Sequence, residues 1–297
     1  MKIAILSRGP YLYSTRSLVR AGMKRGHEMH IVDHTRCSLL VEEQSPNIYY
    51  DGLPLERFDA VIPRIGASVT LLGSAVISQF EAMGAFVAAR PEALLQARDK
   101  LRCLQKLALH GIEVPRTIAV ASGQNLRATV KQLGGLPVVV KLLEGTHGVG
   151  VILADNHRTV EATVEAFQRL GKRVIVQEFI AEAKGRDVRA LVVDGQVVAA
   201  MSRRAQAGEF RSNLHRGAVA GITQLKPEEE RMAVEAVQLM GLDIGGVDFL
   251  HARSGPLVLE VNASPGLEGI ERVSGIDVAG HIIEFVERSV SRQKSKV

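Results

Sequence analysis

The sequence has little cysteine, few aromatic residues and no tryptophan. Its two cysteines, Cys37 and Cys103, stand far apart and form neither a Cys-x-x-Cys motif nor another metal-binding spacing. This excludes a disulfide framework and favours a reducing compartment. Aromatic residues are 4% of the chain, too few to favour the stacking platforms that bind single-stranded nucleic acid.

Long hydrophobic runs are also missing. The apolar run within residues 1–8 is shorter than the core of a signal peptide, and no later stretch has the length of a membrane-spanning helix. We therefore expect a cytoplasmic protein with no membrane partner.

A strong excess of charge of one sign is absent as well. Among 297 residues, 37 Lys and Arg stand against 32 Asp and Glu, giving a net charge of +5 and a pI near 9.3. This permits an acidic partner, but the basic residues are spread among the acidic ones, so we expect no direct recognition of nucleic acid. With 46% hydrophobic residues the chain can bury a sizeable core.

The first 90 residues lack the G-x-G-x-x-G fingerprint of a dinucleotide site but have the pattern of an open parallel α/β domain. Buried strands are predicted at residues 2–6, 30–33, 59–63 and 86–88, helices at 14–25 and 71–83, and a small hairpin around Asp51-Gly52. Arg64 follows a strand at its carboxyl end, where such sheets bind ligands, but an ordinary surface arginine fits the pattern equally well.

A glycine loop between two strands follows in the middle of the chain. One long helix is predicted over residues 91–111 with Lys100 inside it, and a strand over 136–141 ends in Lys141. Gly145, Gly148 and Gly150 follow, and the next strand is 151–154. A Walker loop would place its lysine after the glycines and before a helix, and the His-Arg-Asp and Asp-Phe-Gly motifs of kinases are missing. Either the loop binds phosphates through its amides and Lys141, or it is a turn without a ligand; Lys100 alone fits a solvated helix lysine.

The remaining chain to residue 239 is predicted to contain two helices, three strands and one polar loop. The helices are 161–170 and 227–239, and a strand at 174–180 precedes a hairpin of 186–193 and 196–201 that turns at Asp194-Gly195. The loop, residues 202–221, carries Arg203, Arg204, Arg211 and Arg216. These guanidinium groups suggest an anion, whereas a flexible solvated loop is the plain alternative.

A second hairpin, over residues 246–262, has the pattern of a metal site. Glu260 and Asn262 share one face of a strand, and a turn centred near Ser254 would place Asp248 opposite Glu260. Two carboxylates and an amide oxygen suit Mg²⁺ or Mn²⁺, while a half-exposed hairpin with a polar solvent face remains the alternative. A closing amphipathic helix is predicted at 280–292.

The order of these motifs resembles the ATP-grasp fold: a lysine-ended strand, a glycine loop, Gln177-Glu178-Phe179-Ile180, and an Asp…Glu-x-Asn hairpin. Two segments closely resemble the RimK family, namely residues 211–217 (Arg-Ser-Asn-Leu-His-Arg-Gly) and 260–271 (Glu-Val-Asn-Ala-Ser-Pro-Gly-Leu-Glu-Gly-Ile-Glu). That family ligates glutamate to the carboxyl terminus of the sixth protein of the small ribosomal subunit. The likeness covers essentially the whole chain, including residues 61–66 and 97–102. Arg8-Gly9-Pro10-Tyr11 departs from the expected opening loop, in a region we expect to affect acceptor recognition.

The resemblance implies an N-terminal α/β domain (residues 1–90) and an ATP-grasp fold of two subdomains (91–182 and 183–297). It implies ATP as co-substrate, with Mg²⁺ or Mn²⁺, two ions being expected. The partners would be L-glutamate, the ribosomal protein's C-terminus and further copies of the chain in a homo-oligomer. The implied nucleotide residues are Lys100, Lys141, Gly145, Gly148, Gly150, Glu178, Phe179, Asp187, Arg211, Ser212 and Asn213. The implied metal ligands are Asp248, Glu260 and Asn262.

The chemistry expected of such a site is phosphorylation of an acceptor carboxylate by ATP, followed by attack of the amine of glutamate on the acyl phosphate. Lys141 would offset charge in phosphoryl transfer, and Arg203 is a candidate for stabilising the acyl phosphate or the oxyanion, with a structural salt bridge as its alternative. We expect residues 203–217 to form a lid over bound ATP. Other functions that fit the sequence are a related ligase acting on a small molecule or an amino-group carrier protein, a nucleic-acid-binding module, and an inactive ATP sensor.

Overall fold

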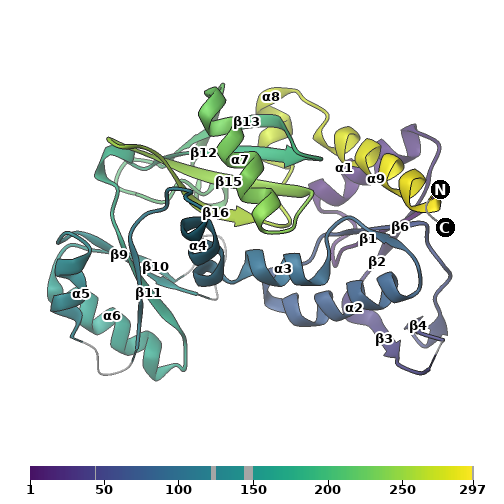
Figure 1. Ribbon diagram of the computed structural model, residues 1–297, viewed down its shortest axis with the longest axis horizontal. Helices are drawn as coiled ribbons and strands as arrows, with labels where there is room; N and C mark the ends of the chain where they lie inside the picture. The colour runs from purple at the N-terminus through teal and green to yellow at the C-terminus, as the bar shows by residue number, and fades with distance from the viewer. Residues whose placement is uncertain (44, 122–124, 144–149, 296–297) are drawn as a thin grey trace.

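The computed structural model describes residues 1–43, 45–121, 125–143 and 150–295. It is a mixed α/β structure, as predicted, with four sheets and helices that pack on them (Figure 1). A parallel sheet lies at one end, an antiparallel sheet with two helices lies at the other, and a five-stranded sheet lies between them.

The N-terminal sheet is parallel, and its central strands, β1 (Lys2–Leu6) and β6 (Ala60–Pro63), are apolar runs, as expected for strands that are covered on both faces. The order of the sheet is β2 (Glu28–Val32), β1, β6 and β7 (Phe86–Val87). The crossover helices are α1 (Tyr13–Lys24) and α2 (Thr70–Ala82). Ile3, Ala4, Ile5 and Leu6 have no exposed surface, so all of β1 after Lys2 is enclosed in the core. The predicted strands and helices of this region are therefore confirmed within a few residues.

A small antiparallel sheet extends from this unit. It consists of β3 (Cys37–Leu40), β4 (Asn47–Tyr50) and β5 (Leu53–Pro54). The predicted hairpin at Asp51-Gly52 is confirmed, and both residues have positive φ, 51° and 82°. A glycine suits the second position because it has no side chain to oppose that conformation. The sequence analysis missed β3.

The single helix predicted over residues 91–111 is wrong, because the chain forms two helices there. They are α3 (Pro91–Arg98) and α4 (Lys100–Leu109), separated by Asp99 in an extended conformation. The Asp99 carboxylate accepts hydrogen bonds from the backbone N–H groups of Leu101 and Arg102, both at 3.1 Å. Asp99 is thus an N-cap, a position that aspartate favours. As a result Lys100 begins a helix and does not lie inside one.

A second, antiparallel sheet has a hydrophobic core of its own. Its order is β10 (Val151–Ala154), β9 (Val138–Leu142), β11 (Val174–Glu178) and β8 (Thr117–Val120). It is covered by α5 (Leu126–Gln132) and α6 (His157–Arg169). Helix α6 begins earlier than predicted because the Asn156 side chain accepts a hydrogen bond from the Thr159 N–H at 2.9 Å. This sheet presents the end of β9, and with it Lys141, toward the five-stranded sheet.

The five-stranded sheet is antiparallel and contains the second predicted hairpin. Its order is β14 (Val219–Ile222), β13 (Gln196–Arg204), β12 (Arg186–Val193), β15 (Ile244–Ala252) and β16 (Gly255–Asn262). The turn at Asp194-Gly195 is confirmed. Helices α7 (Pro227–Leu239) and α8 (Glu268–Ser274) pack against it.

The polar loop predicted over residues 202–221 is partly wrong. Strand β13 continues through Arg204, and β14 takes up the end of the segment. The described connection is therefore residues 205–218, with one short helical turn at Leu214–Arg216. Further single turns of this kind are His34–Arg36, Ala67–Val69 and Ala181–Ala183.

The last helix, α9 (Val278–Lys294), packs on α1, near the start of the chain (Figure 1). Arg25 forms ion pairs with Glu287 at 2.6 Å and Glu284 at 3.0 Å. Ile3 of β1 and Ile282 of α9 belong to one hydrophobic cluster, which also takes in the five-stranded sheet. The two ends of the chain are thus joined through a shared core, and the predicted division at residues 90 and 182 stays a prediction.

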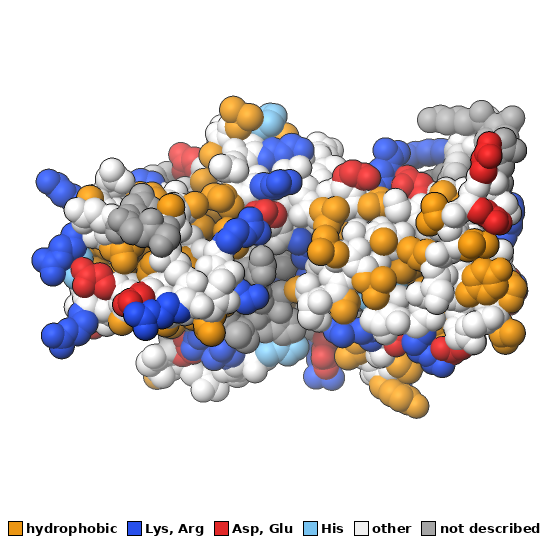
Figure 2. Space-filling model, turned by 90° about the horizontal axis from the view of Figure 1, so that it is seen from below, with side chains coloured by type: hydrophobic (Ala, Val, Ile, Leu, Met, Phe, Trp, Pro, Cys, Tyr) orange, Lys and Arg blue, Asp and Glu red, His pale blue; other side chains and the backbone are white. Residues whose placement is uncertain are grey.

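The surface of the described chain carries charges of both signs. In the view of Figure 2, Lys and Arg side chains are interleaved with Asp and Glu side chains across the face. Within the described ranges, no helix combines the length and the apolar character needed to cross a bilayer.

Candidate functional site

The hairpin of β15 and β16 places the predicted metal ligands side by side. Asp248 pairs with Glu260 across the two strands, and Gly246 pairs with Asn262, so the predicted register is confirmed. The Asn262 Nδ2 donates a hydrogen bond to Glu260 Oε1 at 3.2 Å. Glu260 and Asn262 are half-buried, whereas Asp248 is 2% exposed. The three oxygen-bearing side chains therefore converge on one face of the sheet.

This donor set fits a hard divalent cation. Asp248 accepts two hydrogen bonds from Arg189 and lies 2.9 Å from Arg203 Nη2, so it is an ionised carboxylate of the kind that a divalent cation would take as a ligand. Glu260 would contribute a second carboxylate, and the Asn262 amide oxygen would be the third ligand of such a cation, because the Asn262 nitrogen donates to Glu260. Carboxylate and amide oxygens are the ligands that Mg²⁺ and Mn²⁺ take in proteins.

Arg189 is a site residue that the sequence analysis missed. It lies opposite Asp248 in the register of β12 and β15. Its Nε and Nη2 each lie 2.6 Å from one oxygen of Asp248, a bidentate pair. The signal that could have found it is the alternation Asp187-x-Arg189, which puts both side chains on one face of β12.

Arg203 is buried in a strand and does not lie in a loop, which corrects the sequence-based expectation. It is 4% exposed and forms a bidentate pair with Asp187, with distances of 2.7 and 2.6 Å. Its Nη2 also lies 2.9 Å from Asp248 Oδ2. Burial would lower the pKa of Arg203, but the carboxylates of Asp248 and Asp187 outweigh it and raise the pKa. The salt bridge that was the alternative for Arg203 is therefore present.

A buried network of alternating charge results from these contacts. Asp187, Arg203, Asp248 and Arg189 form one chain across β12, β13 and β15, and Ser212 donates a hydrogen bond to Asp187. Burial acts to raise the pKa of Asp248, but Arg189 and Arg203 hold it well below its usual range. Asp248 is thus charged at neutral pH.

Lys141 lies at the end of β9 and points toward the same region. Its Nζ donates a hydrogen bond to Gln177 Oε1 at 2.6 Å. Burial lowers the pKa of Lys141 to about 8; Glu260 acts against this and Lys100 adds to it. Lys141 is therefore within electrostatic reach of both Lys100 and the predicted metal ligand Glu260, although the three residues come from separate segments.

The glycine loop is only partly described. Gly145 and Gly148 lie outside the described residues. Gly150 is described and has a φ of +68°, and a Cβ at this position would lie 2.4 Å from Leu142 Cδ1. Only glycine fits such a position without strain or a shift of Leu142.

Glu178 and Phe179 lie at the end of β11, beside the connection of residues 205–218. The Glu178 carboxylate accepts hydrogen bonds from the Arg116 backbone N–H at 2.7 Å and from its Nε at 2.8 Å. The Phe179 ring meets the Phe210 ring edge to face, with centroids 6.3 Å apart. This apolar edge has the character of a binding surface for a flat ring.

Arg211 links the connection of residues 205–218 to strand β10. Its Nη1 donates a hydrogen bond to the Val151 carbonyl at 3.2 Å, and its guanidinium lies 5.5 Å from the Phe210 ring centroid. Its ion pair with Glu209, at 2.7 Å, lowers the pKa of Glu209 to about 2. Ser212 contacts Asp187, and Asn213 precedes the turn at Leu214–Arg216. The structure therefore places Arg211, Ser212 and Asn213 between the second sheet and the buried network.

Taken together, the described groups have the arrangement expected of two halves of a site for a nucleotide and a metal. The second sheet supplies Lys141 and the aromatic edge, and the five-stranded sheet supplies the carboxylates and the buried arginines. Phosphates between the halves would meet lysines on one side and a cation held by Glu260 and Asn262 on the other.

Comparison with protein families gives two adjoining matches. A RimK PreATP-grasp domain matches residues 1–94, and a RimK-like ATP-grasp domain matches residues 97–286. A relative from Teredinibacter turnerae named probable alpha-L-glutamate ligase is 53% identical over 296 residues, covering 100% of this chain and 98% of its own. A relative of the same name from Aeromonas salmonicida is 52% identical over 293 residues, covering 99% and 98%.

Solved structures share the fold at low sequence identity. The ATP-grasp ligase PsnB, complexed with a minimal precursor, has a TM-score of 0.75 and 23% identity, with 98% of each chain covered. The D-alanine–D-alanine ligase from Bacillus anthracis complexed with ATP has a TM-score of 0.70 and 18% identity, with 100% of each chain covered. The whole chain thus adopts the ATP-grasp fold.

Proposed function

The chain belongs to the RimK-like ATP-grasp family, and from this premise we propose that it ligates L-glutamate to the C-terminal carboxylate of a protein. Membership makes it an ATP-dependent ligase. The name shared by relatives that are about half identical to it supports glutamate as the amine. We propose the sixth protein of the small ribosomal subunit as the acceptor, because residues 211–217 and 260–271 resemble the family that modifies it.

One observation carries the chemical part of the proposal. Lys141, partly buried and with its pKa lowered to about 8, lies within electrostatic reach of Glu260 on another sheet. A partly desolvated lysine gains most from an anionic ligand when no carboxylate pairs with it, and none does for Lys141 among the described residues. The γ-phosphate of ATP supplies such an anion, and a cation at Glu260 and Asn262 would lie on its other side.

The residues that would hold the divalent ions are Asp248, Glu260 and Asn262. When bound there, such ions would offset the negative charge of the β- and γ-phosphates during transfer. The chain's own part is orientation. Arg189 of β12 and Arg203 of β13 hold Asp248, and Gln177 accepts a hydrogen bond from the Lys141 ammonium group.

The proposed reaction has two steps. An oxygen of the acceptor carboxylate attacks the γ-phosphorus of ATP, ADP leaves, and an acyl phosphate forms. The amine of glutamate then attacks the acyl carbon, the C–O bond to phosphate breaks, and the amine loses a proton, so the products are an amide, ADP and phosphate. In this scheme no side chain of the protein becomes covalently bound to substrate.

Arg203 has a positioning role in this proposal and not the direct role expected from the sequence. Its five N–H groups include those engaged by Asp187 and Asp248, and it is 4% exposed. Its charge therefore reaches the reacting groups through Asp248.

Intact-mass analysis of ribosomal proteins incubated with the protein, ATP, Mg²⁺ and glutamate tests the proposal. We expect one ribosomal protein to gain the mass of one or more glutamyl residues, and ATP and glutamate each to be required. If no ribosomal protein gains mass while ADP forms with a small carboxylic acid or a carrier protein and glutamate, the acceptor proposed here is wrong and the related-ligase alternative holds.

A further inference from the structure

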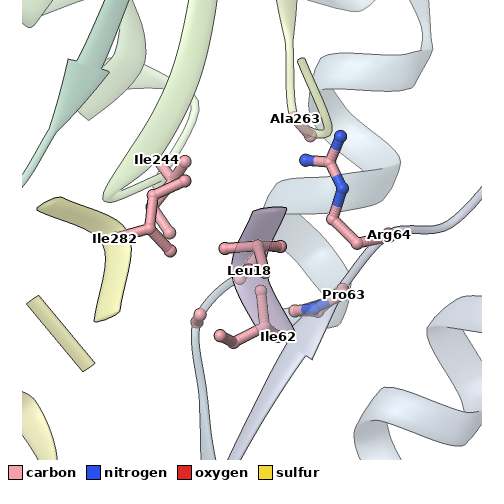
Figure 3. A pocket seen from close by; sticks show the side chains of 9 residues that line it. Leu18, Ile62, Pro63, Arg64, Ile244, Ala263 and Ile282 are labelled. Atoms are coloured by element: carbon pink, nitrogen blue, oxygen red, sulfur yellow. The ribbon is translucent and has the colours of Figure 1, made fainter. Parts of the chain in front are cut away.

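Two arginine side chains, Arg64 and Arg98, lie where the N-terminal sheet meets the hairpin of β15 and β16, which carries the predicted metal ligands and is called the metal hairpin below. Arg64 directly follows β6, and its Nη2 donates a hydrogen bond to the Pro265 carbonyl at 2.7 Å, just beyond β16. Arg98 ends α3, and its Nη2 donates to the Ile65 carbonyl at 2.5 Å. Figure 3 shows Arg64 extending from Pro63 toward Ala263. Both side chains are half-buried.

Neither group has a carboxylate partner among the residues that the structure describes, in contrast to Arg189 and Arg203. The recorded hydrogen bonds of Arg64 and Arg98 go to backbone carbonyls only. Within the described ranges, the buried Arg98 Nε has no hydrogen-bond partner, and neither has the buried Oγ of Ser264, which precedes Pro265. A buried donor without an acceptor, next to unpaired positive charge, is costly unless a ligand completes it.

The electrostatics agree with this geometry. Burial lowers the pKa of Arg64 to about 10, and repulsion from Arg98 adds to the effect. Burial likewise lowers the pKa of Arg98, while the metal ligand Glu260 acts in the opposite direction. The two arginines therefore place two neighbouring positive charges beside the metal hairpin.

We propose that Arg64 and Arg98 form a subsite that binds a carboxylate of a substrate beside the metal hairpin. The inference rests on the proposed ligase function, because it places one of that reaction's substrates. A guanidinium matches the planar, two-oxygen shape of a carboxylate, and Arg98 Nε and Ser264 Oγ supply two further donors. In the proposed function Lys100 and Lys141 bind the phosphates of ATP. The two arginines are therefore available to bind the other anionic group of the reaction, a carboxylate.

The ligand does not enter the cavity beneath Arg64. That cavity is lined by apolar side chains such as Leu18, Ile62 and Ile282 and has a volume of about 10 Å³, the space of about one water molecule (Figure 3). The substrate must therefore meet the guanidinium groups on their polar side, where Glu260 acts on Arg98.

A carboxylate in this reaction comes from one of two sources. Glutamate has two carboxylates that remain intact in the product, and the acceptor brings its C-terminal carboxylate. The chemistry of recognition is the same for both, so the experiment has one arm for each.

The test compares Arg64→Gln and Arg98→Gln with the matched control Arg36→Gln. Arg36 lies in the same N-terminal unit and loses the same charge, but its guanidinium pairs with Asp51. We expect the KM for either glutamate or the acceptor peptide to rise roughly ten- to a hundredfold in the first two variants, the range that charge-assisted hydrogen bonds supply. The KM for ATP should stay near that of the unmodified protein, and Lys variants at both positions should recover part of the loss. The substrate whose KM rises identifies the source.

Unchanged KM values for both carboxylate substrates, or a lower melting temperature as the only effect, would overturn the inference and leave the ligase function standing. If the unmodified protein transfers no glutamate, the proposed function fails, and a measurement without turnover still decides the inference. Arginine labelling by phenylglyoxal, read by mass spectrometry, is run with Mg²⁺, a non-hydrolysable ATP analogue, and glutamate or an acidic C-terminal peptide. Protection of Arg64 and Arg98, with Arg36 unaffected, supports a carboxylate subsite; equal labelling with and without the carboxylates refutes it.

Discussion

Arg189 and Asp248 face each other across β12 and β15, and each of two guanidinium nitrogens lies 2.6 Å from one carboxylate oxygen. The pair is matched in shape as well as in charge. Because Arg203 approaches the same carboxylate at 2.9 Å, the hairpin acid is held from two neighbouring strands. Asp248 therefore balances the charge of Arg189 and part of the charge of Arg203, and its proposed role as a metal ligand would be a second task.

Substitutions at the two acids of the hairpin should differ in their effect on stability. Glu260→Gln should reduce ligation by orders of magnitude and leave the melting temperature nearly unchanged, because Glu260 is half-buried and no ion pair is recorded for it among the described residues. Asp248→Asn should reduce ligation and also destabilise the fold by roughly 3–5 kcal/mol, because it removes the carboxylate paired with Arg189 and one of the two carboxylates that Arg203 contacts. Urea unfolding and steady-state rates check both effects. Equal stability of the two variants would contradict the network, and near-normal turnover in Glu260→Gln would contradict the metal assignment.

Lys141→Met should stabilise the ATP-free protein at neutral pH while abolishing ATP binding. The folded pKa of Lys141 is about 8, below the ordinary value of 10.5, so folding disfavours its charged form. The unfolded chain binds more protons between these two pH values, so stability of the unmodified protein rises with pH in this window and the penalty is fully present below pH 8. The shift corresponds to roughly 3 kcal/mol. The gain of the variant, measured by urea unfolding at pH 7, should shrink as the pH approaches 10; a gain that does not vary with pH would show that charge is not its cause.

Oxygen-18 placed in the acceptor carboxylate should be recovered in the released phosphate. The label moves because the oxygen that attacks ATP leaves with the phosphoryl group when the amine displaces it. Mass spectrometry of the phosphate measures the transfer, and a reaction without glutamate is the control. Label that stays wholly in the peptide product would exclude the acyl phosphate.

ATP should protect the connection of residues 205–218 from an arginine-specific protease. Arg211 and Arg216 lie in this segment, whereas Arg203 is held in β13 by Asp187 and should resist cleavage in every state. A triphosphate supplies charge-assisted partners for Arg211 and orders the segment over the site. Cleavage after Arg211 or Arg216 should be rapid in the free protein and slow with Mg²⁺ and a non-hydrolysable ATP analogue. The same rate in both states would show that this segment is not a nucleotide-ordered lid.

Elements with strong local signals could be predicted from the sequence. The pairing of Asp248 with Glu260 follows from alternation and a turn of known centre, and both carry over into the structure. The break at Asp99 was missed, because apolar residues recur at helical spacing on both sides of it and only the capping side chain ends the helix. The spacing of apolar residues does not show whether one capping side chain stabilises a new helix start more than the continued helix would be stabilised.

The buried charge network could not be predicted in the same way. Arg203 belongs to a run that is polar and rich in arginine, which is typical of a loop, yet its side chain is enclosed because Asp187 and Asp248 stand beside it in the folded sheet. Arg189 could not be predicted as a site residue either, because its carboxylate partner lies on β15, far along the chain. Which charges neutralise one another is decided by strands far apart in the chain, and this information exists only once the register is known.

The packing of α9 on α1 has a consequence for how the protein is made. Ile3 and Ile282 share one hydrophobic cluster, so the first strand lacks part of its covering until the last helix has left the ribosome. Contacts of such long sequence separation form late and slowly, and the apolar face of β1 stays open to water while nearly the whole chain is synthesised. An exposed apolar face of this kind is a surface that chaperones bind. A chain that terminates before residue 278 would lack α9, and the side chains of β1 that pack in the same cluster as Ile282 would lose that part of their core.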